Sequence, residues 1–236
     1  MMQSAELFDI DTWIFDLDNT LYPPETNFLA LIDARITEFV MHETGLDRDA
    51  AYQLQRRLLD DHGTTLAGLM GQYGIDPYRF LDEVHDVSHE SLKPDPDLRA
   101  GLVRLPGRRL VFTNGGAKHA ENVLETLNLS DLFDEVFHLE AADLIGKPRP
   151  HAYDSLIRTH GVHPKTACFF EDSARNLAPA AELGMTTVLV TARPDQLDHR
   201  QAYDRERLDG DVVDFVTDDL ASFLGHVNDA LGSPRE

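Results

Sequence analysis

Two aspartates, Asp16 and Asp18, stand two residues apart directly after a short apolar run, and Asn19 and Thr20 follow them. In an extended segment, residues two apart point to the same side, so both carboxylates can face one site. Two carboxylates this close repel each other unless a cation lies between them or one of them holds a proton. The pair is therefore typical of a magnesium site combined with a general acid. A solvent-exposed turn rich in aspartate is the alternative interpretation.

A second acidic pair, Glu171 and Asp172, follows another apolar run, and Ser173 comes next. Adjacent acids at the end of a buried strand are costly unless they bind a cation or cap a helix. We therefore take Glu171 and Asp172 as candidate metal ligands. The alternative is that Asp172 or Ser173 caps the helix that follows.

Two further features could bind a phosphate group. A glycine-rich turn at 113–116 begins with Thr113, and a hydroxyl followed by backbone N–H groups forms a small anion cradle. Lys147 stands before Pro148, near the start of an expected helix, where an ammonium could supply a point charge to a phosphate. Taken alone, the turn could be an ordinary loop and the lysine could lie on the surface.

These candidate groups stand at the ends of short β-rich runs that alternate with segments of helical length. The expected strands are 12–15, 110–112, 135–138, 167–170, 187–190 and 212–216, and the expected helices are 119–127, 150–160, 174–183 and 220–231. Most of the strands are continuously apolar, which is typical of a parallel sheet with both faces covered. Ligands of such sheets bind at the carboxyl ends of the strands, so the pattern predicts one site that gathers all four groups.

One long segment interrupts this alternation. Residues 27–87 show helical patterning and no convincing strand. Prolines that disfavour helix in the preceding residue stand at 23–24 and at 94 and 96, on either side of the segment. We therefore predict a helical insert at 24–93 and a core made of 1–23 and 94–236. Within the core, the polar segment 193–210 is expected to be a surface loop.

The charge balance limits the partners. The 236 residues carry a net charge of -21, from 21 Lys and Arg against 42 Asp and Glu. Such a surface repels nucleic acid backbones and anionic lipids, so we expect neither a nucleic acid polymer nor a membrane as partner. A small phosphorylated metabolite can still bind where a metal and a few cations reverse the local field. We expect no secretory signal and, with Cys168 as the single cysteine, a cytoplasmic protein.

Together, these features resemble the haloacid dehalogenase superfamily of phosphohydrolases. The matching motifs are Asp16-Leu17-Asp18-Asn19-Thr20, Thr113-Asn114, Lys147 and Glu171-Asp172, with Asp218-Asp219-Leu220 near the C-terminus extending the resemblance. It implies an α/β fold with a Rossmann-like parallel sheet core and a helical, four-helix-like cap domain inserted after strand 1. Within the subgroup that has this cap, the segments 15–23 and 62–69 are most similar to the pyrimidine 5'-nucleotidase branch.

The resemblance also implies a role for each motif residue. Asp16 is the expected nucleophile, and Asp18 is the expected acid/base, which protonates the leaving alkoxide and then deprotonates water. The expected ligands of Mg²⁺ are Asp16, the backbone carbonyl of Asp18, Asp172, and Glu171 directly or through water. The expected phosphate-binding groups are Thr113, Lys147 and the backbone N–H groups of Leu17, Asp18, Asn114 and Gly115. Dehalogenases of the superfamily lack a carboxylate two residues after the nucleophile, so Asp18 favours phosphoryl chemistry.

Substrate choice is expected to lie with the cap, and the branch similarity implies hydrolysis of nucleoside monophosphates such as UMP or CMP. The candidates to contact the base or ribose are Tyr22, Phe28, His62, Thr64, Thr65 and His85, each of which could instead be a packing or surface residue. Phosphoglycolate, a sugar phosphate, FMN and pyridoxal phosphate are alternative substrates. A mutase, a receiver-like phosphorylation switch and a binding module without catalysis are alternative functions, and the oligomeric state is left open.

Overall fold

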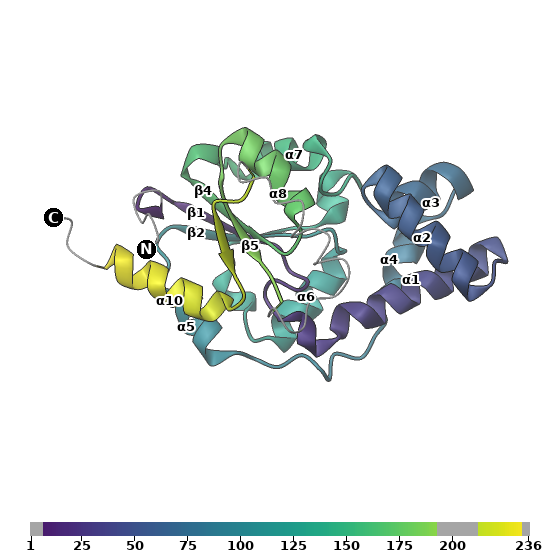
Figure 1. Ribbon diagram of the computed structural model, residues 1–236, viewed down its shortest axis with the longest axis horizontal. Coiled ribbons are helices and arrows are strands. Elements are labelled where there is room, and N and C mark those ends of the chain that lie inside the picture. Colours follow the sequence, from purple (N-terminus) through teal and green to yellow (C-terminus); the bar gives the residue numbers. More distant parts are fainter. Residues whose placement is uncertain (1–6, 193–211, 233–236) are drawn as a thin grey trace.

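The computed structural model describes residues 7–192 and 212–232 (Figure 1). The N-terminal segment 1–6 and the expected surface loop at 193–210 lie outside the described residues. Within the described part, strands alternate with helices around one parallel sheet, so the α/β class that the sequence predicts is confirmed.

The sheet has six strands in the order β3-β2-β1-β4-β5-β6, and every neighbouring pair is parallel. The strands are β1 (Thr12–Phe15), β2 (Arg108–Phe112), β3 (Glu135–Phe137), β4 (Ala167–Glu171), β5 (Thr186–Val190) and β6 (Phe215–Thr217). Every residue of β1 and β4 is buried. These strands are continuously apolar because helices cover both faces of the sheet and leave no solvent side.

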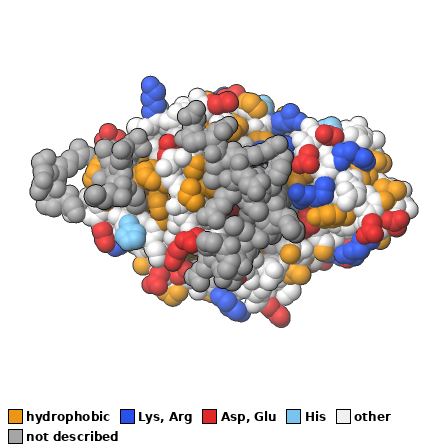
Figure 2. Space-filling view, viewed as in Figure 1, with side chains coloured by type: hydrophobic (Ala, Val, Ile, Leu, Met, Phe, Trp, Pro, Cys, Tyr) orange, Lys and Arg blue, Asp and Glu red, His pale blue; other side chains and the backbone are white. Residues whose placement is uncertain are grey.

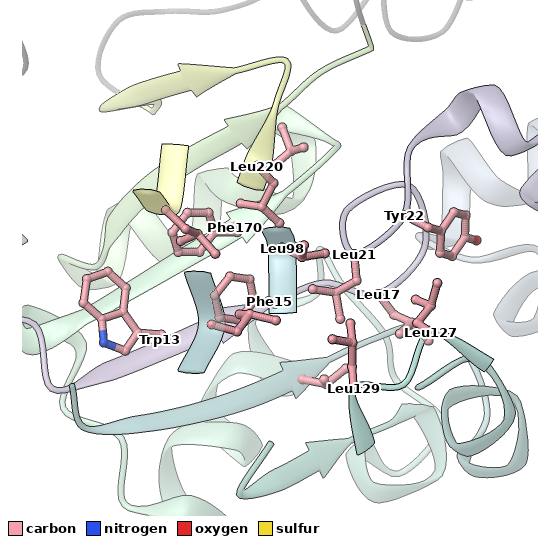
Figure 3. Packing of buried hydrophobic residues seen from close by; sticks show 14 of the residues in the cluster. Trp13, Phe15, Leu17, Leu21, Tyr22, Leu98, Leu127, Leu129, Phe170 and Leu220 are labelled. Carbon is pink, nitrogen blue, oxygen red and sulfur yellow. The ribbon is translucent and has the colours of Figure 1, made fainter. Parts of the chain in front are cut away.

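Successive residues of a strand point to opposite faces, and β1 supplies both halves of the core. The helices on the sheet are α5 (Pro96–Arg104), α6 (Ala117–Thr126), α7 (Pro150–His160), α8 (Ala174–Leu183) and α10 (Leu220–Leu231). Trp13 and Phe15 pack on the face covered by α5, α6 and α10, and Figure 3 shows Phe15 beside Phe170 in that packing. Ile14 packs on the other face, under α7 and α8. The centre of the sheet, which carries the site, is thus anchored from both sides.

Several elements differ from their predicted bounds. β2 begins at Arg108 and β5 at Thr186, both earlier than predicted, while β3 ends at Phe137 and β4 at Glu171. The last strand begins at Phe215 rather than at 212, because side-chain bonds replace the ladder before it: the Asp214 carboxylate accepts from the Thr187 N–H at 2.8 Å. The helix expected at 119–127 spans Ala117–Thr126, since it starts directly after the extended residue Gly116. The helices predicted at 150–160, 174–183 and 220–231 have the observed bounds.

Four α-helices lie between β1 and α5, beyond one end of the sheet (Figure 1). They are α1 (Phe28–Thr44), α2 (Arg48–His62), α3 (Thr65–Tyr73) and α4 (Pro77–Val84). Phe39, Leu58 and Phe80 belong to a hydrophobic cluster formed mainly by these helices. Asp47 and Thr64 cap α2 and α3 by accepting backbone N–H bonds, which explains where these helices begin. Treating 24–93 as a separate domain stays a prediction.

Two arginines of the core hold the C-terminal end of α2. Arg175 donates to the carbonyl of Asp60 at 3.0 Å, and Arg149 donates to the carbonyl of Asp61 at 2.9 Å. The last carbonyls of a helix have no partner within the helix, so guanidinium groups bind them well. These bonds set how α2 faces the end of the sheet.

The surface shows no single charged patch on the face in Figure 2, where acidic and basic side chains lie interspersed outside the grey region. The excess of acidic residues is therefore not gathered at one place on this face. In the part of the chain that the structure describes, none of the helices has the length and apolar character needed to cross a membrane.

Candidate active site

The candidate catalytic residues lie at the carboxyl ends of the central strands. Asp16 follows β1, Thr113 follows β2 and Glu171 ends β4, and β1 lies between the other two strands. The N–H of Asp16 donates to the carbonyl of Phe170 at 2.8 Å, which extends the ladder one residue past β1. Parallel pairing therefore carries these three side chains to one edge of the sheet, far apart though they are in the sequence.

A cavity of about 1670 Å³ lies between this edge and the helical insert. The predicted site residues in its wall are Asp16, Asp18, Thr64, Thr65, His85, Thr113, Asn114, Gly115, Lys147, Glu171 and Asp172. Among the described residues, four other candidates do not line it: Leu17, Tyr22, Phe28 and His62. The cavity is therefore walled by motif residues on the core side and by α1, α2, α3 and α4 on the other.

Lys147 lies at the centre of the charged groups. Its ammonium donates to Asp16 Oδ1 at 2.7 Å, to Glu171 Oε2 at 2.6 Å and to the carbonyl of Phe112 at 2.7 Å. These bonds use all three donors of the ammonium. Because the residue is only 1% exposed, it is not a surface lysine. The carboxylates of Asp16 and Glu171 outweigh burial and raise the pKa of Lys147, so its charge is retained.

The negative charge that the carboxyl groups around Lys147 can carry exceeds the single positive charge of the lysine. Burial and the nearby charge of Glu171 raise the pKa of Asp16 to about 8, although Lys147 acts in the opposite direction. Burial also raises the pKa of Glu171 to about 7 against the effect of Lys147, with Asp172 adding to the rise. A further cation would offset the burial and the mutual repulsion that raise these two pKa values.

The donor set fits a hard divalent cation. Asp16, Glu171 and Asp172 each offer a carboxylate oxygen, and these oxygens all lie within 4.8 Å of one another. Mg²⁺ prefers oxygen ligands of this kind and is commonly bound by a small number of carboxylates. Asn19, in the left-handed conformation at φ 60°, places its amide 3.4 Å from Asp172 Oδ2. The residues present are therefore suited to hold magnesium.

The turn after β2 holds Lys147 as well as shaping the cavity. The side chain of Asn114 donates to the carbonyl of Lys147 at 2.9 Å and accepts from its N–H at 2.7 Å. The N–H of Gly115 donates to Thr113 Oγ1 at 2.9 Å. The side chain of Asn114 thus has a positioning role that sequence reasoning did not assign, because the two residues are 33 positions apart.

Asp18 lies in the cavity wall, and two side chains that are not part of this wall bond to its carboxylate. Tyr22 donates its hydroxyl to Asp18 Oδ1 at 2.6 Å, and His119 Nε2 lies 2.9 Å from the same oxygen. Burial would raise the pKa of Asp18, but the charge and hydrogen bond of His119 and the bond from Tyr22 lower it to about 2. Burial and the Asp18 charge raise the pKa of Tyr22, so its hydroxyl remains a donor.

The candidates for substrate contact separate into two groups. Thr64 and Thr65 line the cavity, where Thr64 caps α3 and Thr65 donates to the carbonyl of Gln55 at 3.3 Å. His85 also lines it, at the C-terminal end of α4. By contrast, Tyr22 and Phe28 pack in the core below Asp18, and His62 Nε2 lies 3.1 Å from Gln72 Nε2. Contact between any of them and a substrate stays a prediction.

Sequence reasoning missed several cavity residues on the helices. Tyr52 and Arg56 line it from α2, and Arg175 lines it from α8. Tyr52 and Arg56 are four positions apart, so they lie on one face of α2, away from its buried face at Leu54 and Leu58. That spacing was a usable signal, but nothing in the sequence says which exposed face of a helix meets the site.

Comparison with known proteins supplies an independent finding. The sequence model of the haloacid dehalogenase-like hydrolase family matches residues 10–184. The chain is also 28% identical over 194 residues to Phosphate metabolism protein 8 of Saccharomyces cerevisiae. That match covers 75% of this chain and 60% of the yeast protein, so the chain spans about 60% of the length of this relative.

Solved structures share the fold. A HAD phosphatase from Thermococcus onnurineus superposes with a TM-score of 0.60 at 18% identity, covering 92% of this chain and 98% of that one. L-2-haloacid dehalogenase from Xanthobacter autotrophicus superposes with a TM-score of 0.59 at 20% identity, with the same coverage of both chains. Proteins with two different reactions thus share this architecture, so the fold alone does not choose between them.

Proposed function

The chain belongs to the haloacid dehalogenase-like hydrolase family, and from this membership we propose that it hydrolyses phosphomonoesters through a covalent phosphoryl group on Asp16. The observation that carries the proposal is Asp18, a second carboxylate in the same cavity wall. Release of an alkoxide from phosphorus requires a proton, whereas release of a halide from carbon does not. A carboxylate held beside the nucleophile therefore favours phosphoryl transfer over dehalogenation.

In the proposed first step, a carboxylate oxygen of Asp16 attacks phosphorus and the bond from phosphorus to the ester oxygen breaks. Asp18, which takes up a proton from solvent once the phosphate has bound, gives this proton to the departing oxygen, and the alcohol leaves. The approaching phosphate dianion raises the proton affinity of Asp18, because a like charge disfavours the carboxylate. Lys147 keeps Asp16 in place, and its positive charge, together with the hydroxyl of Thr113, would stabilise the phosphoryl oxygens.

In the proposed second step, Asp18 takes a proton from water, and the resulting oxygen attacks the same phosphorus. The bond between phosphorus and Asp16 breaks and inorganic phosphate leaves. Asp16 is again a carboxylate, and Asp18 releases its proton to solvent once the phosphate has left. Asp16, Glu171, Asp172 and the backbone carbonyl of Asp18 would hold magnesium. When bound, magnesium would offset the negative charge that gathers as a carboxylate meets a phosphate.

For the substrate, we propose a pyrimidine nucleoside monophosphate, UMP or CMP. Support comes from the motif similarity of 15–23 and 62–69 and from a cavity of about 1670 Å³, which has room for a nucleotide. The name of the yeast relative, a phosphate metabolism protein, is compatible with this class of substrate.

We further propose that 24–93 acts as a cap domain on a core of 1–23 and 94–236, and that the protein works in the cytoplasm.

Phosphate release from the purified chain tests the proposal. With Mg²⁺ we expect turnover of p-nitrophenyl phosphate, its loss on chelation, and no turnover by Asp16→Asn, whose folding is checked by circular dichroism. A panel of UMP, CMP, AMP, GMP, phosphoglycolate, FMN and pyridoxal phosphate tests the substrate. Preference for a purine or non-nucleotide ester would overturn the pyrimidine assignment, and absence of any phosphate release would overturn the phosphatase assignment.

A further inference from the structure

A buried histidine of α6 lies directly behind the carboxylate of Asp18. The Nε2 atom of His119 is 2.9 Å from Asp18 Oδ1 and 3.1 Å from Oδ2, and the histidine side chain is 0% exposed. An ionised carboxylate can only accept hydrogen bonds, so Nε2 carries the proton in this contact. The other ring nitrogen, Nδ1, has no hydrogen-bond partner among the described residues. The polar contact of this ring is therefore directed at Asp18.

The packing around the ring fixes its position. His85, at the end of α4, stacks on it with ring centroids 4.2 Å apart and planes 15° apart, and Phe28 lies parallel to it at 6.0 Å. Gly115 leaves the space that the ring fills, because a Cβ at that position would come within 2.7 Å of His119 Cδ2. A ring packed this closely cannot turn to follow the carboxylate, so it acts as a fixed donor.

The two oxygens of Asp18 are held unequally. Oδ1 accepts from the Tyr22 hydroxyl at 2.6 Å and has the shorter contact with His119. Among the described residues, Oδ2 has only the longer contact with His119, at 3.1 Å. Two donors on Oδ1 occupy its lone pairs. This leaves Oδ2 as the oxygen with free capacity to carry a proton.

We propose that His119 is a positioning residue for the acid/base, which holds the Asp18 carboxylate so that Oδ2 faces the oxygen leaving phosphorus. The inference rests on the proposed phosphomonoesterase function and adds to it a residue outside the family motifs. A carboxylate free to rotate would meet the leaving oxygen in only part of its orientations. Proton transfer would then slow while attack by Asp16 would not.

The test compares leaving groups, because only some of them need the proton. p-Nitrophenolate is a weak base that leaves unaided, whereas the alkoxide of UMP, or of the best alkyl ester in the panel, must be protonated. The ratio kcat/KM reports the steps up to release of the alcohol, before Asp18 acts on water. It therefore isolates the acid role of Asp18.

Two variants of similar length, His119→Gln and His119→Met, separate the hydrogen bond from packing. We expect His119→Met to lower kcat/KM for the alkyl ester about 10- to 100-fold and for p-nitrophenyl phosphate less than about threefold. His119→Gln, which keeps an N–H donor, should restore most of the alkyl activity. Adding His119→Met to Asp18→Asn should cost the alkyl ester nothing further, since the two residues act as one unit.

Equal losses on both esters would make His119 merely structural and would overturn the inference, as would an unchanged or faster alkyl reaction in His119→Met. The activity on p-nitrophenyl phosphate also serves as the folding control, because it requires an intact site. If the native chain releases phosphate from neither ester, the proposed function is wrong, and the inference about His119 is then wrong as well.

Discussion

The two sides of the cavity are built from different kinds of contact. On the sheet side, which we call the cavity floor, Lys147 and Glu171 are each 1% exposed and bond to each other and to Asp16. On the helix side, the cavity roof, Tyr52 is 41% exposed, and Arg56 is half-buried and forms no ion pair with another described residue. The charged groups of the floor are buried and bonded to one another, whereas Tyr52 and Arg56 of the roof are more exposed.

This difference indicates that the floor carries out the reaction and the roof selects the substrate. Groups that react must be in place before the substrate arrives, because reorganising them during the reaction adds to the barrier. Groups that choose the substrate need unused hydrogen-bonding capacity, since a pocket recognises its ligand through a few polar contacts. Among the α2 side chains in the cavity wall, Gln55 already bonds to Thr37 at 2.6 Å and to Asp33 at 2.7 Å. We therefore take Tyr52 and Arg56 as the candidates of this helix for that task.

The largest effect is expected from removing the cation of the floor. Lys147→Met leaves Asp16 and Glu171 buried without their partner, which should lower the free energy of unfolding by about 3 to 5 kcal/mol and abolish phosphate release. Urea unfolding and the phosphate assay measure the two effects. Lys165→Met, at an exposed position, is the matched control and should change neither. Full activity in Lys147→Met would show that the floor does not depend on its internal bonds.

A smaller effect is expected from pH and magnesium. The pKa values of Asp16 and Glu171 are raised to about 8 and about 7, so the folded metal-free protein binds more protons than the unfolded chain. This contribution to stability is fully present below about pH 4 and is lost as the pH rises through 7 and 8. Added Mg²⁺ should therefore raise the melting temperature more at pH 8 than at pH 5.

Thermal unfolding with Mg²⁺ and with a chelator, across this pH range, measures the difference. Glu171→Gln removes one of the titrating groups and should weaken the dependence on magnesium. An equal response to Mg²⁺ at both pH values would argue against a cation held by Asp16 and Glu171.

The smallest effect is expected in the roof. Arg56→Ala should raise KM a few-fold, on the order of 1 kcal/mol, and leave kcat nearly unchanged, because the side chain would contact the substrate before and during the reaction alike. Arg57→Ala is the matched control, since this neighbour is exposed and is not part of the cavity wall among the described residues. A fall in kcat without a change in KM would place Arg56 with the reacting groups and remove the contrast between floor and roof.

The floor could be predicted because it follows from strand order alone. Asp16, Thr113 and Glu171 each end a continuous apolar run, and parallel pairing brings such ends together whatever lies between them. The sheet, four of the helices and the place of the helical insert could also be predicted, because the spacing of apolar residues within each segment indicates its secondary structure. The sixth strand was predicted too early because the Asp214 carboxylate replaces backbone pairing there.

The remaining contacts depend on tertiary packing that no local pattern encodes. His119 and Asp18 are separated by 101 positions, and the histidine falls within an ordinary amphipathic helix. Which face of α2 meets the cavity depends on how Arg149 and Arg175 hold its end. From the sequence, such residues could be chosen only by the chemical nature of their side chains. The structure then distinguished those in the cavity wall from those packed behind it.

The most direct test of the account is chemical trapping of the covalent intermediate. The protein is mixed with Mg²⁺ and substrate, quenched in acid during turnover and treated with borohydride, which reduces an aspartyl phosphate to homoserine. Peptide mass spectrometry then locates the change. If Asp16 is the nucleophile, we expect homoserine at position 16 and an intact aspartate at position 18. Homoserine at position 18, or continued turnover with neither residue modified, would contradict it.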